Sequence, residues 1–254
     1  MSSGKVFLIG AGPGDPELLT LKAARCLAQA DVILLDDLVD RGVLRFAGAA
    51  ARVIAVGKRG GCKSTPQAFI ERLMVRLARR GKIVARVKGG DPLVFGRGGE
   101  EMEALVVAGI EVEVVPGITA GIGVPAALGI PVTHRDIARG VTFVTGHTRD
   151  GAEVDWGALA RTGTTLVIYM GMSRLPRLVA EMLEKGFPSH MPACAIQNGT
   201  LATQREVVTT LGELAVDVAG AGLGSPAILI VGDVVRYARV AAALPALRAT
   251  EGRR

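Results

Sequence analysis

The chain has 254 residues, enough for one large domain or two medium ones that each bury a full core. Hydrophobic residues make up 49% of it, aromatic residues only 4%, and 34 residues are glycine, which excludes a disordered chain and suits α/β layers with tight turns. The net charge of +6 comes from scattered basic residues without interleaved aromatics, a pattern that argues against nucleic-acid binding and favours an anionic small molecule.

The three cysteines, Cys26, Cys62 and Cys194, are far apart and form no Cys-x-x-Cys pair, which predicts a reducing compartment and no disulfide framework or zinc site. The first residues lack the apolar core of a signal peptide. Residues 114–132 carry no charge, but their three prolines and four glycines would break a membrane-spanning helix. We therefore expect a cytoplasmic protein without membrane contact, and we interpret this stretch as an interdomain hinge and a buried helix.

The chain opens with a predicted strand, Val6–Ile9, a glycine turn, Gly10–Asp15, and a predicted helix, Pro16–Ala30. Asp15 before Pro16 is typical of a helix N-cap followed by a favourable first helical residue. The predicted apolar face of the helix consists of Leu18, Leu21, Ala24 and Leu27. The turn resembles the dinucleotide-binding fingerprint but lacks its third glycine, so alone it is a weak signal.

Four more strands are predicted in the first half, separated in several places by helices, as in a mostly parallel sheet. The predicted strands are Val32–Leu35, Arg52–Val56, residues 83–88 and Glu111–Val115. The predicted helices run from a cap at Thr65-Pro66 to about Arg80, and from Glu100 to Ala108.

Pro116-Gly117 marks a domain boundary, so we predict an N-terminal α/β domain at 1–116 and a C-terminal α/β domain at 117–245. The predicted strands of the second half are Val141–Thr145, Thr165–Met170, Ala193–Gln197, Gln204–Thr209 and Ala227–Val231. Its predicted helices lie near 119–128, 174–185, 212–219 and 234–244. Two such domains would face each other across a cleft, a common place for ligands.

The loop Lys88–Glu101 follows a predicted buried strand and contains five glycines among its fourteen residues. Glycine lets the backbone come close to a ligand, and ligands of open α/β sheets bind beyond the carboxyl ends of strands. Asp91 is the one short carboxylate in this loop, suited to accept hydrogen bonds from ribose hydroxyls or an amine. We interpret the loop as a ligand-binding segment rather than a glycine-rich surface turn.

Several common chemistries are absent from the sequence. The only histidines, His134, His147 and His190, have no metal-ligand spacing, so we predict no metal site. The chain also contains neither a Gly-x-Ser-x-Gly nucleophile elbow nor a phosphate-binding P-loop.

Polar residues at strand ends are the remaining candidates. Asp36 and Asp37 follow the second predicted strand, and Lys58 and Arg59 follow the third, so in a parallel sheet they open on the edge of the glycine-rich loop. A carboxylate and an amine there can exchange protons with a substrate, or they can form a solvated pair.

Two residues of the second half carry similar alternatives. Arg135 can bind a substrate carboxylate or pair with Asp136. Met170 can rest on a ring or thioether, or belong to the core.

In order along residues 5–240, a set of segments closely resembles the uroporphyrinogen-III C-methyltransferase branch of the tetrapyrrole methyltransferases. These enzymes have the class III S-adenosylmethionine-dependent methyltransferase fold. Within the set, Gly-Gly-Asp-Pro and Thr-His-Arg-Asp are specific to this branch. The segments are Gly10–Lys22, Lys88–Glu101, Val115–Ala120, Thr133–Asp136, Val144–His147, Tyr169–Gly171, Gln197–Thr200 and Ser225–Ala227.

This resemblance implies two α/β domains with a cleft between them, S-adenosyl-L-methionine in the cleft, S-adenosyl-L-homocysteine as product, and a homodimer. It implies methylation of uroporphyrinogen III at two ring carbons, through precorrin-1 to precorrin-2, for sirohaem and cobalamin. Carried over by motif, Asp36 is the proton acceptor and Lys58 the proton donor, while Arg59, Arg97 and Arg135 suit the substrate carboxylates. The implied methyl-donor contacts are Pro13, Gly89, Gly90, Asp91, Val94, Thr119, Ala120, Met170 and Gly199.

The sequence departs from the branch next to the expected base. Leu35 stands where members often have Tyr, and Asp37 stands where many have Arg, so Asp37 is an alternative base. Three rival functions stay open: methylation of a later precorrin, non-catalytic nucleotide or tetrapyrrole binding, and NAD-dependent hydride transfer.

Overall fold

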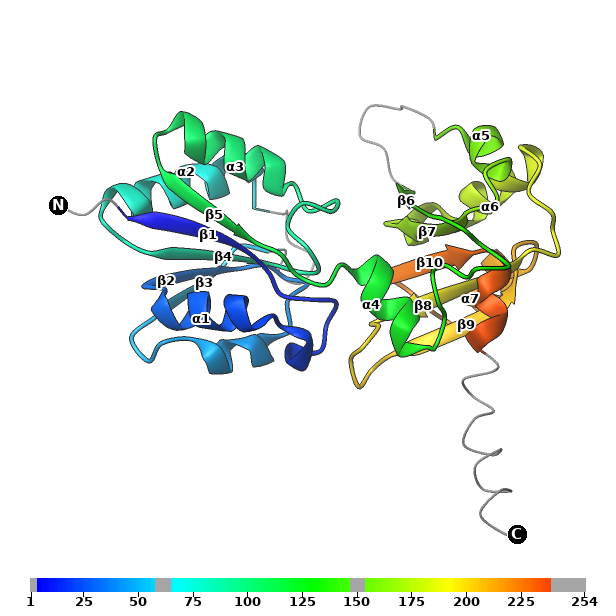
Figure 1. Cartoon of the computed structure of the whole chain (residues 1–254), viewed down its shortest axis with the longest axis horizontal. Helices are drawn as coiled ribbons and strands as arrows, with labels where there is room; N and C mark the ends of the chain where they lie inside the picture. Colours follow the sequence, from blue (N-terminus) through cyan, green and yellow to red (C-terminus); the bar gives the residue numbers. More distant parts are fainter. Residues whose placement is uncertain (1–3, 58–64, 147–153, 239–254) are drawn as a thin grey trace, which may run out of the picture. The chain divides into compact units, whose positions relative to one another are not determined.

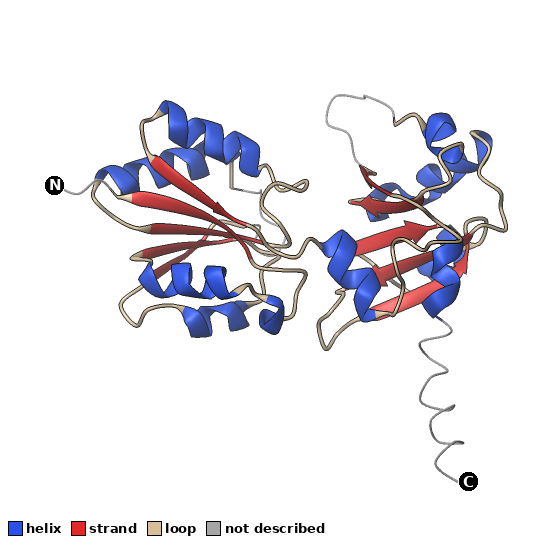
Figure 2. Ribbon diagram, viewed as in Figure 1, coloured by secondary structure: helices blue, strands red, loops and turns tan. Residues whose placement is uncertain are grey.

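A computed structural model describes residues 4–57, 65–146 and 154–238 of the chain (Figures 1 and 2). The chain divides into two compact units, Met1–Ala120 and Gly121–Arg254. Each unit contains one five-stranded sheet with helices packed against it. This arrangement confirms the predicted α/β class.

The sheet of the first unit is entirely parallel, in the order β3-β2-β4-β1-β5, as the alternation of strands and helices predicted. Its inner strands β1, β2 and β4 are almost completely buried, which explains the apolar runs Val6–Ile9 and Val32–Leu35. The strands are β1 Lys5–Gly10, β2 Val32–Leu35, β3 Arg52–Ala55, β4 Val84–Lys88 and β5 Glu111–Val115.

Helices cover both faces of this sheet (Figure 1). Helix α1, Leu21–Gln29, packs on one face, against side chains such as Phe7 and Ile33. Helices α2, Gln67–Arg79, and α3, Gly98–Val107, pack on the other, against Val6 and Leu34 among others. Because strand side chains alternate between faces, each of β1, β2, β4 and β5 supplies both cores, whereas the edge strand β3 contributes Ile54 to one of them.

The predicted helix Pro16–Ala30 is wrong in its first part. Pro16–Leu18 forms a short 3-10 helix, η1, whose N-cap is Asp15, and the chain is extended again before α1 begins. The side chain of Thr20 accepts a hydrogen bond from the Ala23 N–H and so caps α1. This break rotates the helix, so that Ala23, Cys26 and Leu27 are buried and the predicted core residue Leu21 is exposed.

The sheet of the second unit has the order β6-β7-β10-β8-β9 and is mixed, because β10 is antiparallel to β7 and β8 while β6 and β7 are parallel. The carboxyl ends of strands β6, β7 and β8 therefore share one edge of this sheet. The strands are β6 Val141–Thr145, β7 Thr165–Tyr169, β8 Pro192–Gln197, β9 Arg205–Thr210 and β10 Ala227–Val231.

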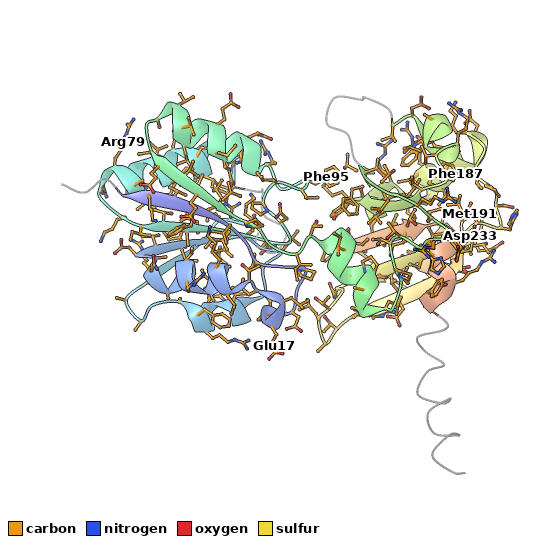
Figure 3. The ribbon with its side chains drawn as sticks, viewed as in Figure 1. Glu17, Arg79, Phe95, Phe187, Met191 and Asp233 are labelled. Atoms are coloured by element: carbon orange, nitrogen blue, oxygen red, sulfur yellow. The ribbon has the colours of Figure 1, made fainter. Side chains whose placement is uncertain are left out.

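A single apolar cluster covers one face of the second sheet, formed with α5, α6 and α7. Phe187 and Met191, labelled in Figure 3, extend this cluster beyond the end of α6. The sequence did not predict α5 or the 3-10 helices at 41–46 and 172–174, whereas the described part of the predicted helix 234–244 is helical and overlaps η4. The helices are α4 Ala120–Ala127, α5 Trp156–Ala160, α6 Leu175–Glu184 and α7 Leu214–Gly220, with 3-10 helices η2 Arg41–Phe46, η3 Met172–Arg174 and η4 Asp233–Arg236.

Within the described residues, no helix is both long enough and apolar enough to cross a membrane. The charge-free stretch noted in the sequence contains the short helix α4, which has Pro125 inside it and buries Gly121, Gly123 and Val124.

Cys194 on β8 is expected to make the free energy of unfolding depend on pH in the alkaline range. Its thiol is fully buried, and burial raises its pKa from 9.0 to about 12. Below pH 9 the thiol is protonated in both states, so its contribution to stability is fully present; above pH 9 it ionises only in the unfolded chain. We expect stability to fall by up to about 1.4 kcal/mol per pH unit on this account.

Urea unfolding of the wild type and of Cys194→Ala at pH 8, 9 and 10 measures this effect. The stability difference between the two proteins should shrink above pH 9. A difference that stays constant would show that the thiol does not govern the alkaline loss.

Candidate active site

Three loops meet at the carboxyl edge of the first sheet. The turn after β1 pairs with the loop after β4, because Gly12 N–H donates to Gly90 O at 3.2 Å and Gly90 N–H donates to Gly12 O at 2.6 Å. Gly90 in turn lies against the backbone of Thr119 and Ala120, which follow β5. Segments far apart in the sequence are thus brought together by backbone alone.

Glycine is required where these loops cross. A Cβ atom built on Gly10 would lie 2.5 Å from Gly117 N and 2.6 Å from Gly90 O, and one built on Gly117 would collide with Gly90 O. Gly90 also has a left-handed φ of 66°. The three strand ends can approach each other this closely only without side chains.

Asp91 fixes the loop after β4 to the segment after β5. Its Oδ1 accepts from Leu93 N–H at 2.8 Å, and its Oδ2 accepts from Gly117 N–H at 3.1 Å. Each carboxylate oxygen still has a lone pair for a ligand. Asp91 therefore has a structural role that its predicted role toward a ligand did not include.

Seven of the predicted donor contacts belong to these three touching loops. The structure brings together Pro13, Gly89, Gly90, Asp91, Val94, Thr119 and Ala120.

The loops after β2 and β3 lie beside the same edge. A Cβ on Gly57 would collide with the backbone of Asp37, and one on Gly89 would lie 3.2 Å from the Cβ of Leu38. The predicted proton donor Lys58 and the predicted substrate ligand Arg59 come directly after Gly57, outside the described residues.

Asp36 and Asp37 have different surroundings. Asp36 Oδ2 accepts from Arg86 Nη2 at 2.7 Å, and its Oδ1 accepts from the Asp37 N–H at 2.8 Å. The Asp36 side chain is 30% exposed, so it is held from below and open to solvent above. Asp37 is exposed, and its backbone N–H helps to hold Asp36.

Beneath Asp36 lies a buried cluster of charges that the sequence analysis missed. Oε1 of Glu101 accepts from Arg86 Nε at 3.1 Å, from Lys88 Nζ at 3.2 Å and from Gln67 Nε2 at 3.1 Å. Glu101 is fully buried, and its Oε2 has no hydrogen-bond partner among the described residues. With Asp36, the cluster holds two cations and two anions. We call Asp36, Arg86, Lys88 and Glu101 the buried charge cluster.

A signal for this cluster is present in the sequence. Val84–Lys88 has the pattern of a buried strand, yet Arg86 and Lys88 interrupt it two residues apart and so point to one face. That face is covered by α2 and α3, which supply Gln67 and Glu101. Burial lowers the pKa of the Lys88 ammonium, and the neighbouring Arg86 charge lowers it further.

Arg97, a predicted substrate ligand, sits at the start of α3 with a left-handed φ of 60°. Its guanidinium binds the carboxylate of Glu100, with Nε to Oε1 at 3.0 Å, and this hydrogen bond raises its pKa. Phe95, labelled in Figure 3, also has a positive φ and is exposed. Left-handed backbone at non-glycine residues is strained, and such strain clusters at functional sites.

In the second unit, Met170 follows β7 with a left-handed φ of 55°. Its side chain is 49% exposed, so the alternative that Met170 belongs to the core is wrong. The preceding Tyr169 is buried, and its hydroxyl accepts from the Gly121 N–H at 2.6 Å in the first turn of α4. A Cβ on Gly121 would collide with that hydroxyl.

Gly199 follows β8, on the same sheet edge as Met170. A Cβ there would collide with the side chain of Val124 on α4. Its neighbours Asn198 and Thr200 both have positive φ, and for a β-branched residue such as Thr200 this is a strained conformation. Both donor contacts predicted in the second half thus stand beside strained backbone on one edge.

Arg135 is exposed, and among the described residues it forms no ion pair with Asp136. The adjacent His134 is fixed instead: its Nε2 bonds the Tyr237 hydroxyl at 2.7 Å, and its Nδ1 accepts from the Asp136 N–H at 3.2 Å. The guanidinium of Arg135 is available for an anion.

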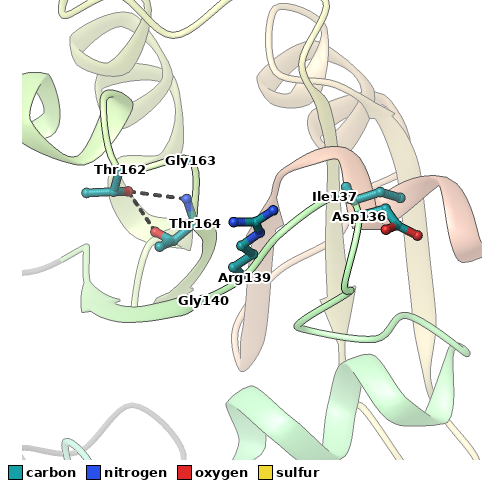
Figure 4. A pocket seen from close by; sticks show the side chains of 7 residues that line it. All are labelled: Asp136, Ile137, Arg139, Gly140, Thr162, Gly163 and Thr164. Carbon is teal, nitrogen blue, oxygen red and sulfur yellow. Dashed lines mark hydrogen bonds between the residues drawn. The ribbon is translucent and has the colours of Figure 1, made fainter.

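Two surface hollows lie away from these loops. One, about 370 Å³, is lined by Arg139, Asp136 and the segment Thr162–Thr164 before β7, at the opposite sheet edge from Met170 (Figure 4). The other, about 600 Å³, lies on the outer face of α2 and α3 and is lined by four arginines of the α2 segment. Neither hollow is lined by a predicted site residue.

In the described part of the chain, no three His, Cys, Asp or Glu side chains are grouped to hold a metal ion.

Fold and sequence agree on the class of protein. Residues 5–215 match the family of Tetrapyrrole (Corrin/Porphyrin) Methylases, and the chain belongs to this family.

Individual similar proteins have more specific names than the family. The uroporphyrinogen-III C-methyltransferase of Pseudomonas aeruginosa is 56% identical over 92% of this chain and 95% of its own length. A crystal structure of uroporphyrin-III C-methyl transferase from Thermus thermophilus, complexed with S-adenyl homocysteine, is 42% identical with a TM-score of 0.79, covering 92% of this chain and 94% of that one. The siroheme synthase of Methylobacillus flagellatus is 49% identical over 92% of this chain, which spans half of that protein.

The close contact at Gly117 gives a direct test of the loop junction. Gly117→Ala places a methyl group against Gly90 O, so we expect a loss of about 1–3 kcal/mol of stability and weaker binding of S-adenosyl-L-homocysteine. Gly99→Ala is the matched control, because a Cβ there has no atom within 4 Å. Urea unfolding and calorimetric titration measure both effects. Equal behaviour of the two variants would contradict the proposed tight junction.

Proposed function

We propose that the chain is an S-adenosyl-L-methionine-dependent C-methyltransferase that converts uroporphyrinogen III through precorrin-1 to precorrin-2 by two ring-carbon methylations. The product serves the biosynthesis of sirohaem or cobalamin. The observation that carries this proposal is the 56% identity to a uroporphyrinogen-III C-methyltransferase across nearly the whole length of both chains.

The loop residues of the first unit suit the methyl donor. Gly89 and Gly90 offer backbone without side chains, and the carboxylate of Asp91 is held in a fixed orientation by two N–H groups. Pro13 and Val94 add half-buried apolar surface. In the second unit, the exposed Met170 and the small Gly199 provide the further contacts. When bound, S-adenosyl-L-methionine supplies an electrophilic methyl group, so the protein's main task is to position the reactants.

Asp36 acts as the base. Loss of a proton from the tetrapyrrole makes a ring carbon nucleophilic or restores conjugation, and a carboxylate oxygen of Asp36 takes up that proton. Arg86 and the Asp37 N–H orient the carboxylate while leaving it open to solvent on one side. In the described structure the Asp37 carboxylate has no such support, which favours Asp36 over Asp37 as the base.

The substrate is ringed with acetate and propionate groups, which arginine side chains bind well. Arg135 is exposed and has no ion pair among residues 4–57, 65–146 and 154–238, and Arg97, although bound to Glu100, is about half exposed. Together with Arg59 they are the proposed carboxylate ligands, and Lys58 is the proposed proton donor. The homodimer and the cytoplasmic location stay predictions of this proposal.

Anaerobic incubation with S-adenosyl-L-methionine and uroporphyrinogen III, followed by mass spectrometry of the tetrapyrrole, tests the function. We expect the tetrapyrrole to gain two methyl groups. One methyl group would mean that the reaction stops at precorrin-1. Donor binding without transfer to uroporphyrinogen III would contradict the proposal, and transfer to a later precorrin instead would identify the rival activity.

The base is tested with two isosteric variants. Asp36→Asn should fold normally, because the amide oxygen can still accept from Arg86, yet turnover should fall about 10²-fold or more. Asp37→Asn should keep turnover within about threefold, since its side chain has no place in the cluster. Circular dichroism and initial rates measure the two properties. An active Asp36→Asn protein beside an inactive Asp37→Asn protein would reverse the assignment.

A further inference from the structure

The buried charge cluster is unusual because it places charged side chains in the core between β4 and α3. Arg86 and Glu101 are 2% and 0% exposed, and Lys88 is almost as deeply buried. Taking charges out of water is so costly that a buried ion pair is often no more stable than an apolar replacement. One oxygen of Glu101 also has no partner within the described part of the chain, which adds to the cost. Stability alone therefore does not explain why these charges are there.

The cluster has a direction. Glu101 and Lys88 lie in the interior, Arg86 lies between, and the partly exposed Asp36 lies at the surface end. Arg86 uses Nε for Glu101 and Nη2 for Asp36, so its planar guanidinium is held by two carboxylates at once. Gln67 adds an uncharged hydrogen bond to Glu101 from α2. The orientation of Arg86, and through it that of Asp36, is set from the interior.

We propose that Glu101 is a positioning residue for methyl transfer, which acts through Arg86 to hold the Asp36 carboxylate toward the substrate. The inference rests on the proposed function and on Asp36 as its base. Glu101 itself does not touch substrate: its contacts are with Arg86, Lys88 and Gln67. Lys88 has a separate role, which is to balance the negative charge of Glu101 in the interior.

The alternative is that Glu101 only neutralises Lys88. Charge-balanced variants separate the two roles. Glu101→Gln removes one negative charge and weakens the anchor of Arg86, whereas Glu101→Gln combined with Lys88→Met removes one charge of each sign and still leaves Arg86 with a single carboxylate. Glu103→Gln on the exposed face of α3 is the matched control.

We expect Glu101→Gln to unfold at a lower urea concentration than the wild type and to lose about tenfold or more in kcat. KM for uroporphyrinogen III and the calorimetric Kd of S-adenosyl-L-homocysteine should stay within about twofold, because the loops that bind them are unchanged. In the double variant the urea midpoint should return toward the wild-type value while kcat stays low. Glu103→Gln should match the wild type in every measurement.

Two results would overturn the positioning role. The first is a double variant that recovers kcat together with its urea midpoint, which would leave Glu101 as a counter-charge only. The second is Glu101→Gln with wild-type kcat. Failure of the proposed function has a different signature: the wild-type protein itself would bind S-adenosyl-L-homocysteine and transfer no methyl group to uroporphyrinogen III.

Discussion

The contact between the backbones of Gly10, Gly90 and Gly117 is the constraint on which the candidate site depends. A parallel sheet brings the carboxyl ends of β1, β4 and β5 to one edge, but ordinary side chains would keep their loops apart. Without Cβ atoms the loops touch, and Asp91 then joins two of them through hydrogen bonds to backbone N–H groups. Pro13, Gly90 and Ala120 become neighbours for this reason. The surface of the three loops is rich in backbone N–H and C=O groups, as a small-molecule site requires.

The buried charge cluster lies beside this backbone junction. Strands β2 and β4 are adjacent, with Leu34 opposite Arg86, so the side chains of Asp36, Arg86 and Lys88 point to the same face. Helix α3, which begins directly after the glycine-rich loop, brings Glu101 onto that face. One segment of chain therefore supplies both the proposed donor-binding backbone and the buried carboxylate beneath the proposed base.

Much of this was readable from the sequence. Hydrophobic patterns predicted the ten strands of the described residues to within one residue at each end, because most of these segments are rich in apolar residues and bounded by glycine or polar residues. The failures have local causes. The helix 16–30 was predicted as continuous because apolar spacing alone does not reveal the cap at Thr20. This cap starts a new helix with a different buried face. The buried charge cluster was missed because its members pair across three elements. The positions of Arg86 and Lys88 within a buried strand indicate buried charge but do not reveal the partners.

Asp36 shows where sequence reasoning stops. Its neighbour Asp37 is chemically identical, and the residues flanking the pair, Leu35 and Leu38, distinguish neither. The difference arises in three dimensions, since one carboxylate reaches a buried guanidinium and the other reaches solvent. An ionised base needs an orienting partner that does not itself move, and a guanidinium fixed by an interior carboxylate meets that need. In the proposed mechanism, the buried charges are explained by the carboxylate that they orient at the edge of the sheet.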